Sequence, residues 1–230
     1  GLDSKGYIKA SCSFGRVFFG EDQTGREVAV KVVTAQPGET IDDLKKEGDF
    51  LITMNGSEHV VASSEVGYME ENPPRMFIVM NKIDGEELSS KKGSLSLKNK
   101  VKVLKDVALG LQELHNKGII HRDLKPDNTL VENSNNKARL LDLGISEEAV
   151  DRPSDPSGTP LYISPEALSG KEQGIKSDTY SFGIMMHELL TDEVLGLHNG
   201  NVGMRLNSSL TVNHRSYSMR GIPKEASVKI

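Results

Sequence analysis

The chain has 230 residues, of which 36% are hydrophobic and 27% are charged, an ordinary balance for a globular protein that excludes bulk disorder. Its formal net charge of -5 gives no basic footprint, so nucleic acid is not an expected partner. A single cysteine, Cys12, fits a reducing compartment, and no stretch reaches the ~18 apolar residues of a membrane span. We therefore expect a cytoplasmic protein or, since residue 1 is not methionine, a cytosol-facing domain of a longer one.

The first third of the chain has the pattern of a small antiparallel sheet with one helix. Between residues 7 and 33, apolar β-forming residues alternate with turns that contain glycine. A helical pattern follows over residues 42–54. Two more strands are predicted at residues 60–61 and 76–80, the second after a turn that contains two prolines.

The pattern changes after residue 84. Apolar residues recur at three- and four-residue steps over 97–114, which predicts a long amphipathic helix that ends at Gly118. A second helix is predicted over 177–190, and it is apolar almost all round, as buried helices are. The simplest architecture is α+β with two unequal lobes: a sheet lobe over 1–81, a hinge at 82–84 and a mainly helical lobe over 85–230. Beyond residue 190 the apolar pattern fades, so the second lobe is either truncated or compact.

One run of residues carries most of the chemical information. His121-Arg122-Asp123-Leu124-Lys125-Pro126-Asp127-Asn128 lies between the long helix and a short strand predicted at 129–131. This run strongly resembles the catalytic loop of eukaryotic-type Ser/Thr protein kinases, and the resemblance extends over residues 7–190. It implies the bilobal kinase fold, ATP and Mg²⁺ as cofactors, and protein substrates that bear Ser or Thr.

The resemblance assigns a role to each polar residue of this loop. Asp123 would accept the proton of the substrate hydroxyl, and Lys125 would reach the γ-phosphate of ATP. Asn128 would hold a magnesium ion, together with Asp142 of the sequence Asp142-Leu143-Gly144, which resembles the metal-binding Asp-Phe-Gly of the family. Without this context, Asp123 would be read as a turn cap and Lys125 as a solvated side chain.

The sheet lobe contains the matching half of the site. Val28-Ala29-Val30-Lys31 resembles the strand whose lysine holds the α- and β-phosphates, and Glu47 is its expected ion-pair partner. For Lys31 the alternative is a solvated strand end, and for Glu47 it is an ordinary surface glutamate.

The remaining nucleotide-binding positions follow from the same resemblance. The phosphate-covering loop would include Ala10, Cys12 and Gly15, although only Gly15 keeps the glycine of the family pattern. Met80 would be the gatekeeper, Ile83 would offer backbone groups to adenine, and Glu87 would contact the ribose. The adenine would lie between side chains of the two lobes, which are Val17, Ala29 and Leu130. Plain core packing is the alternative for these apolar residues.

Residues 158–166 resemble the end of a kinase activation segment, which is typical of kinases that act on proteins. Ser154 and Ser157 are candidate phosphorylation sites there, and Asp178 resembles the buried aspartate that anchors the catalytic loop. Two other functions stay open. The missing glycines would suit a pseudokinase that binds nucleotides or proteins without catalysis, and the third reading is a kinase for small molecules.

Overall fold

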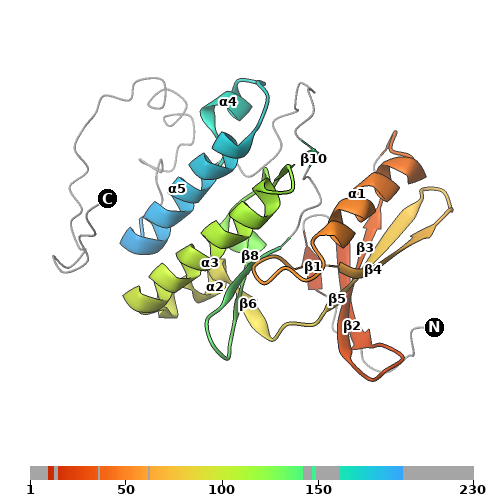
Figure 1. The fold of residues 1–230 in the computed structure, drawn as a ribbon, viewed down its shortest axis with the longest axis horizontal. Helices are drawn as coiled ribbons and strands as arrows, with labels where there is room; N and C mark the ends of the chain where they lie inside the picture. The colour runs from red at the N-terminus through yellow and green to blue at the C-terminus, as the bar shows by residue number, and fades with distance from the viewer. Residues whose placement is uncertain are drawn as a thin grey trace.

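The structure is a computed structural model, and it describes residues 10–12, 15–35, 37–61, 63–141, 147–148 and 161–193. These residues form two parts that lie side by side, a sheet with one helix and a larger part dominated by helices (Figure 1). A single connection, residues 82–84, joins strand β5 of the first part to strand β6 of the second. The α+β architecture expected from the sequence, a small antiparallel sheet with one helix followed by a mainly helical part, is confirmed.

The first part is a five-stranded antiparallel sheet in the order β1-β2-β3-β5-β4. Its strands are β1 (Ala10–Cys12), β2 (Gly15–Glu21), β3 (Glu27–Thr34), β4 (Ser63–Met69) and β5 (Arg75–Asn81). Because partners in an antiparallel register point to the same face, the pairings of β2, β3 and β5 place six side chains on one face. These are Val17, Phe19, Ala29, Lys31, Ile78 and Met80.

The prediction of a strand at residues 60–61 is wrong. Val60 makes only an isolated parallel bridge to Leu140, and the real edge strand, β4, begins at Ser63. The residues of β4 include two serines, a glutamate and a glycine, so this edge strand has no strong apolar signal. Val60 itself is almost fully buried, and the hydrophobicity that suggested a strand instead packs against the second part of the molecule.

Helix α1 (Ile41–Thr53) matches the helical pattern at 42–54 and packs across β4 and β5. Its first turn is closed by a capping box, in which the Thr40 Oγ1 accepts from the Asp43 backbone N–H and the Asp43 carboxylate accepts from the Thr40 N–H. Leu44 and Leu51 bury the inner side of the helix against the sheet.

The second part begins with β6 (Gly85–Glu87), helix α2 (Leu88–Lys91) and the short 3-10 helix η1 (Lys92–Ser94). Helix α3 (Leu97–His115) follows, capped by Ser96 at its start, and Gly118 takes φ +73 just beyond its end, as predicted for a glycine that stops a helix. A small sheet in the order β6-β8-β9 lies on this helix, with β8 (Thr129–Glu132) and β9 (Ala138–Leu140).

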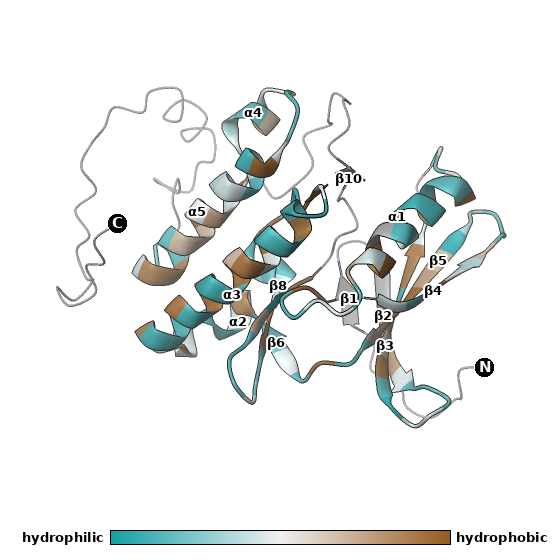
Figure 2. Cartoon of the chain, viewed as in Figure 1, coloured by the Kyte–Doolittle hydropathy of each residue, from teal (hydrophilic) through white to brown (hydrophobic). Residues whose placement is uncertain are grey.

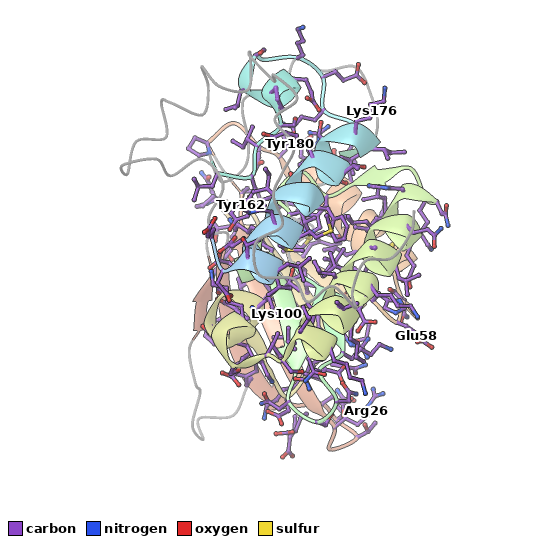
Figure 3. The ribbon with its side chains drawn as sticks, turned by 90° about the vertical axis from the view of Figure 1, so that its left-hand side faces the viewer. Arg26, Glu58, Lys100, Tyr162, Lys176 and Tyr180 are labelled. Atoms are coloured by element: carbon purple, nitrogen blue, oxygen red, sulfur yellow. The ribbon has the colours of Figure 1, made fainter. Side chains whose placement is uncertain are left out.

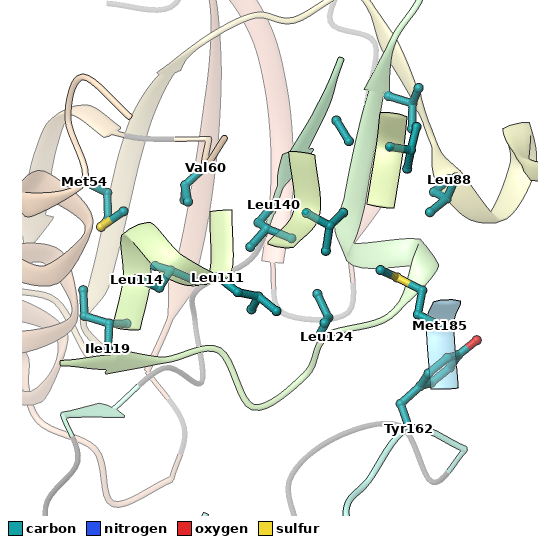
Figure 4. Close-up of a cluster of buried hydrophobic side chains, with 14 of the residues drawn as sticks. Met54, Val60, Leu88, Leu111, Leu114, Ile119, Leu124, Leu140, Tyr162 and Met185 are labelled. Atoms are coloured by element: carbon teal, nitrogen blue, oxygen red, sulfur yellow. The ribbon is translucent and has the colours of Figure 1, made fainter. Parts of the chain in front are cut away.

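The remaining elements are β7 (Ile119–Ile120), which pairs with β10 (Glu147–Glu148), the 3-10 helix η2 (Pro126–Asn128), helix α4 (Pro165–Leu168) and helix α5 (Ile175–Thr191). Helices α3 and α5 pack against each other and give the second part its core (Figure 1). Figure 4 shows that this core is continuous, from Met54 and Val60 through Leu111 and Leu140 to Met185.

Hydrophilic and hydrophobic residues alternate along α3, whereas α5 is mostly of intermediate or hydrophobic character (Figure 2). Within the described part of the chain, no helix is both long enough and apolar enough to cross a membrane.

Candidate active site

The loop from His121 to Asn128 brings together two predicted catalytic residues, Asp123 and Lys125, and the predicted metal ligand Asn128. The Asp123 Oδ2 atom accepts hydrogen bonds from the Lys125 Nζ at 2.7 Å and from the Asn128 Nδ2 at 2.8 Å. The same Nδ2 donates to the Asp123 backbone carbonyl at 2.8 Å. Asp123 is only 4% exposed, and a carboxylate that is buried this far needs such charged and polar partners. The loop therefore fixes an anionic group beside a cationic one.

The backbone of this loop is held by Asp178 of α5, as the resemblance predicted. Its carboxylate is fully buried and accepts from the backbone N–H groups of His121 and Arg122, both at 2.9 Å. Arg122 has φ 67, an uncommon conformation for a residue with a side chain, and the bond to its N–H supports this strained turn. The His115 Nε2 atom lies 2.7 Å from the same carboxylate, a partner that the sequence did not reveal.

The His121 side chain belongs to the core of the site. It is fully buried, and among the described residues neither ring nitrogen has a hydrogen-bond partner. Burial lowers the pKa of His121 below its usual value. The negative charges of Asp178 and Asp123 would raise this pKa, but their effect is smaller than that of burial. The ring is therefore neutral at physiological pH and contributes packing rather than charge.

The predicted metal-binding residues are only partly described. Both hydrogen bonds of the Asn128 side chain use its Nδ2, which turns the amide oxygen, the atom that a metal would bind, away from Asp123. The Leu141 N–H donates to the Asn128 carbonyl at 2.9 Å, so the chain leaves β9 next to Asn128. Asp142 itself lies outside the described residues. An amide oxygen and a carboxylate are hard oxygen ligands that suit Mg²⁺.

No cluster of three or more His, Cys, Asp or Glu side chains that could hold a metal by itself occurs among the described residues.

Lys31 lies in the middle of β3 and is 7% exposed, so the solvated strand end considered as its alternative does not hold. It shares its sheet face with the nucleotide-binding candidates Val17, Ala29 and Met80. Glu47, its predicted partner, is a residue of α1, but its side chain lies outside the described residues.

The other predicted nucleotide contacts come from both parts of the molecule. Val17 and Ala29 are buried, Met80 and Ile83 are half-buried, and Glu87 is exposed. In the small sheet, Glu87 of β6 pairs directly with Leu130 of β8, so the predicted ribose and adenine contacts are neighbours.

The predicted phosphate loop is a tight β1–β2 hairpin. Ala10 pairs with Val17 and Cys12 with Gly15, so both departures from glycine are accommodated in strand backbone. The side chains of these loop residues, and the tip at 13–14, lie outside the described residues.

Further along the chain than the loop from His121 to Asn128, hydrogen bonds join residues 161–164 and α4 to α5. The Ser177 Oγ donates to the Glu166 Oε1 at 2.8 Å, and the Ser164 Oγ caps α4. The Tyr162 hydroxyl donates to the Glu188 Oε2 at 2.5 Å, and Lys92 forms an ion pair with the same buried carboxylate. Figure 3 shows Tyr162 beside α5. Glu188 is a charged residue in a mostly apolar stretch of α5, but the sequence does not show which residues it contacts.

Ser154 and Ser157, the candidate phosphorylation sites, lie outside the described residues.

The model of the protein kinase domain family matches residues 11–221 of the chain. Serine/threonine-protein kinase pkn2 of Myxococcus xanthus is 34% identical over 197 residues, which are 79% of this chain and 23% of that protein. Serine/threonine-protein kinase PknB of Mycolicibacterium smegmatis is 30% identical over 187 residues, 73% of this chain and 29% of that protein. Human serine/threonine-protein kinase D3 is 30% identical over 193 residues, 80% of this chain and 22% of that protein. The chain thus spans less than a third of the length of each of these relatives.

Proposed function

Because the chain belongs to the protein kinase domain family, we propose that it transfers the γ-phosphoryl group of ATP to Ser and Thr hydroxyls of protein substrates. The observation that carries this proposal is the arrangement of Asp123, Lys125 and Asn128, in which one buried carboxylate binds both a lysine and an amide. The printed names of the bacterial and human relatives support Ser and Thr as the acceptors.

In the proposed reaction, the substrate hydroxyl gives its proton to the Asp123 carboxylate while its oxygen attacks the γ-phosphorus. The bond between that phosphorus and the ADP oxygen breaks, and ADP leaves. The Lys125 ammonium, held at the Asp123 carboxylate, neutralises charge on the transferring phosphoryl group. Lys31 orients the α- and β-phosphates. Mg²⁺, bound by Asn128 and Asp142, would neutralise the charge of the phosphates.

We place the lobe boundary at the connection 82–84, with the sheet lobe over 1–81 and the helical lobe over 85–230. The adenine would lie between Val17 and Ala29 of one lobe and Leu130 of the other, with Met80 behind it and Ile83 and Glu87 at its edge. Since the donor is ATP, we also propose that the domain works on the cytosolic side. Ser154 and Ser157 are the proposed sites of regulatory phosphorylation.

The test is incubation with radiolabelled ATP, Mg²⁺ and a generic protein substrate, followed by phosphoamino-acid analysis. We expect phosphoserine or phosphothreonine. In the matched Asp123→Asn variant, turnover should fall by ~10²-fold or more because the general base is lost, while ATP binding is kept.

If the wild-type protein transfers no more phosphate than Asp123→Asn, the second candidate function applies, a pseudokinase that binds nucleotides or proteins. The observation in its favour is the β1–β2 hairpin, where Ala10 and Cys12 stand in place of glycines.

A further inference from the structure

The turn between α1 and β4 is bonded to the helical lobe through its backbone. The Leu140 N–H donates to the His59 carbonyl, and the Val61 N–H donates to the Leu140 carbonyl, both at 2.8 Å. Between these bonds Val60 is buried, pairs with Leu140 in an isolated bridge and belongs to the hydrophobic cluster of Figure 4. The end of α1 is therefore fixed to β9, the strand that leads into Asp142.

Helix α3 approaches this turn closely. A Cβ atom at Gly110 would lie 2.9 Å from the His59 carbonyl oxygen and 2.9 Å from the Leu140 Cδ1. Only a glycine at this position lets α3, β9 and the turn meet without a shift of the backbone.

Glu113, one turn further along α3, organises the same turn with both of its carboxylate oxygens. Its Oε1 lies 2.6 Å from the His59 Nδ1, and its Oε2 accepts a hydrogen bond from the Ser57 hydroxyl. The Ser57 Oγ in turn accepts from the backbone N–H groups of His59 and Val60, at 3.2 and 2.9 Å. Through Ser57, the carboxylate of Glu113 thus holds the N–H groups of His59 and Val60, next to the His59 carbonyl that binds Leu140.

Glu113 is ionised when it does this. Burial alone would raise its pKa, but the hydrogen bonds from Ser57 and His59 and the nearby His59 charge together hold the pKa of Glu113 below its ordinary value. The Glu113 side chain is 31% exposed and that of His59 is 15% exposed, so their contact is less accessible to water than a contact between surface side chains.

The turn connects the two halves of the proposed nucleotide site. Helix α1 carries Glu47, the predicted partner of Lys31, and β9 precedes the predicted metal ligand Asp142. We propose that Glu113, together with Ser57, is a positioning residue for Mg²⁺-bound ATP, because it keeps α1 and β9 in one fixed arrangement. This inference rests on the proposed function. Without these bonds, a smaller fraction of molecules has the binding-competent arrangement, and the apparent nucleotide affinity falls by that fraction.

A neighbouring ion pair provides a matched control. Glu58 lies in the same turn and binds the Lys137 Nζ at 3.0 Å, so it also joins the turn to the helical lobe. Its side chain is 75% exposed, however, and lies at the molecular surface (Figure 3). Exposed pairs of this kind contribute little to stability.

The experiment compares Glu113→Gln, Ser57→Ala, Ser57→Thr and Glu58→Gln with the wild type. For each protein, one measures the Kd of Mg²⁺-bound ATP by calorimetry, KM for ATP and for a protein substrate, and Tm. We expect Glu113→Gln and Ser57→Ala to raise the Kd and KM for ATP by roughly 3- to 10-fold, within the range of indirect coupling effects. KM for the protein substrate should not change. Ser57→Thr keeps the hydroxyl and should restore near wild-type values, and Glu58→Gln should stay within about 1.5-fold of them.

A lower Tm in Glu113→Gln and Ser57→Ala with unchanged affinity for ATP would overturn the positioning role and leave only a structural one. A wild-type protein that binds Mg²⁺-bound ATP but transfers no phosphate would refute the proposed function alone, since the ratios of Kd would still test Glu113. A wild-type protein that does not bind the nucleotide would overturn both.

Discussion

At the residue scale, Asp178 shows how a buried charge on α5 can fix the backbone of the loop from His121 to Asn128. Its buried carboxylate accepts hydrogen bonds from two backbone N–H groups and contacts the His115 ring. Asp178→Asn keeps the shape of the side chain but removes its charge. It also replaces one acceptor oxygen by an N–H₂ group, which cannot accept a hydrogen bond from the backbone N–H groups of His121 and Arg122. We expect a loss of roughly 3 kcal/mol in the free energy of unfolding, typical of a broken buried charge network. Urea denaturation measures this loss.

The control is Asp127→Asn, an exposed aspartate in the same loop, which should change the free energy of unfolding by less than about 0.5 kcal/mol. If the two variants were equally stable, the Asp178 carboxylate would not be the anchor of the loop.

Glu166 gives a prediction with a pH dependence. Partial burial disfavours its charged form, but hydrogen bonds from its own backbone N–H, from Ser177 and from Ser164 outweigh this and lower the pKa of Glu166 below its ordinary value. A carboxylate with a lowered folded pKa stabilises the protein above its unfolded pKa of ~4.3, and this contribution is lost as the pH falls through the folded value.

Glu166→Gln should therefore cost about 0.5–1 kcal/mol at pH 7, since the group is partly solvated. The difference in Tm from the wild type should shrink as the pH is lowered from 5 to 3. A difference that is constant over this range would mean that the charge of Glu166 contributes nothing to stability.

At the scale of elements, α1 reaches its place on the sheet through Gly48. A Cβ atom there would lie 2.1 Å from the Tyr68 hydroxyl oxygen and 2.9 Å from the Val66 Cγ1 on β4. Alanine at this position would gain up to ~1 kcal/mol of helix propensity but would overpack the interface, at a cost of ~1–3 kcal/mol. We expect Gly48→Ala to be destabilising on balance, as measured by thermal unfolding.

Two further variants test whether the loss of stability comes from the contact between the added Cβ and Tyr68. Gly48→Ala combined with Tyr68→Phe removes the shortest contact and should recover part of the lost stability. Gly183→Ala, in α5, has no atom within 4 Å of the added Cβ and should not destabilise the protein. A Gly48→Ala protein as stable as Gly183→Ala would show that α1 can move away from β4 at no cost.

At the scale of the whole molecule, strong periodicity was enough to predict the elements that fill the core. The patterns at 42–54, 97–114 and 177–190 correspond to α1, α3 and α5 within two residues at each end. Strand β4 was missed because an edge strand of polar residues has no periodic signal, and Val60 was misassigned because burial by a distant strand, β9, looks like β-propensity in the sequence.

In the candidate site, too, the sequence predicted some contacts and missed others. Asp123, Lys125 and Asn128 are close in sequence, and their arrangement followed from one motif. The contacts of Glu113 with Ser57 and His59, and of Tyr162 and Lys92 with Glu188, join residues that are far apart along the chain. Such pairs depend on how α3 and α5 pack, and no local pattern in the sequence encodes that packing.

If the two lobes bind one nucleotide between them, the nucleotide should stabilise the whole molecule. A ligand at 100 times its Kd adds about 2.7 kcal/mol to the free energy of unfolding, which for a chain of this size corresponds to a rise of roughly 5–10 °C in Tm. We expect this rise with a non-hydrolysable ATP analogue and Mg²⁺, measured by thermal unfolding. Asp123→Asn should show the same rise, because the proposed role of Asp123 is at the substrate hydroxyl and not at the nucleotide. Asp142→Ala should show little or none, because it removes the proposed ligand of the metal. An equal rise in Asp142→Ala would exclude Asp142 as a metal ligand, and no rise in the wild type would exclude the nucleotide site itself.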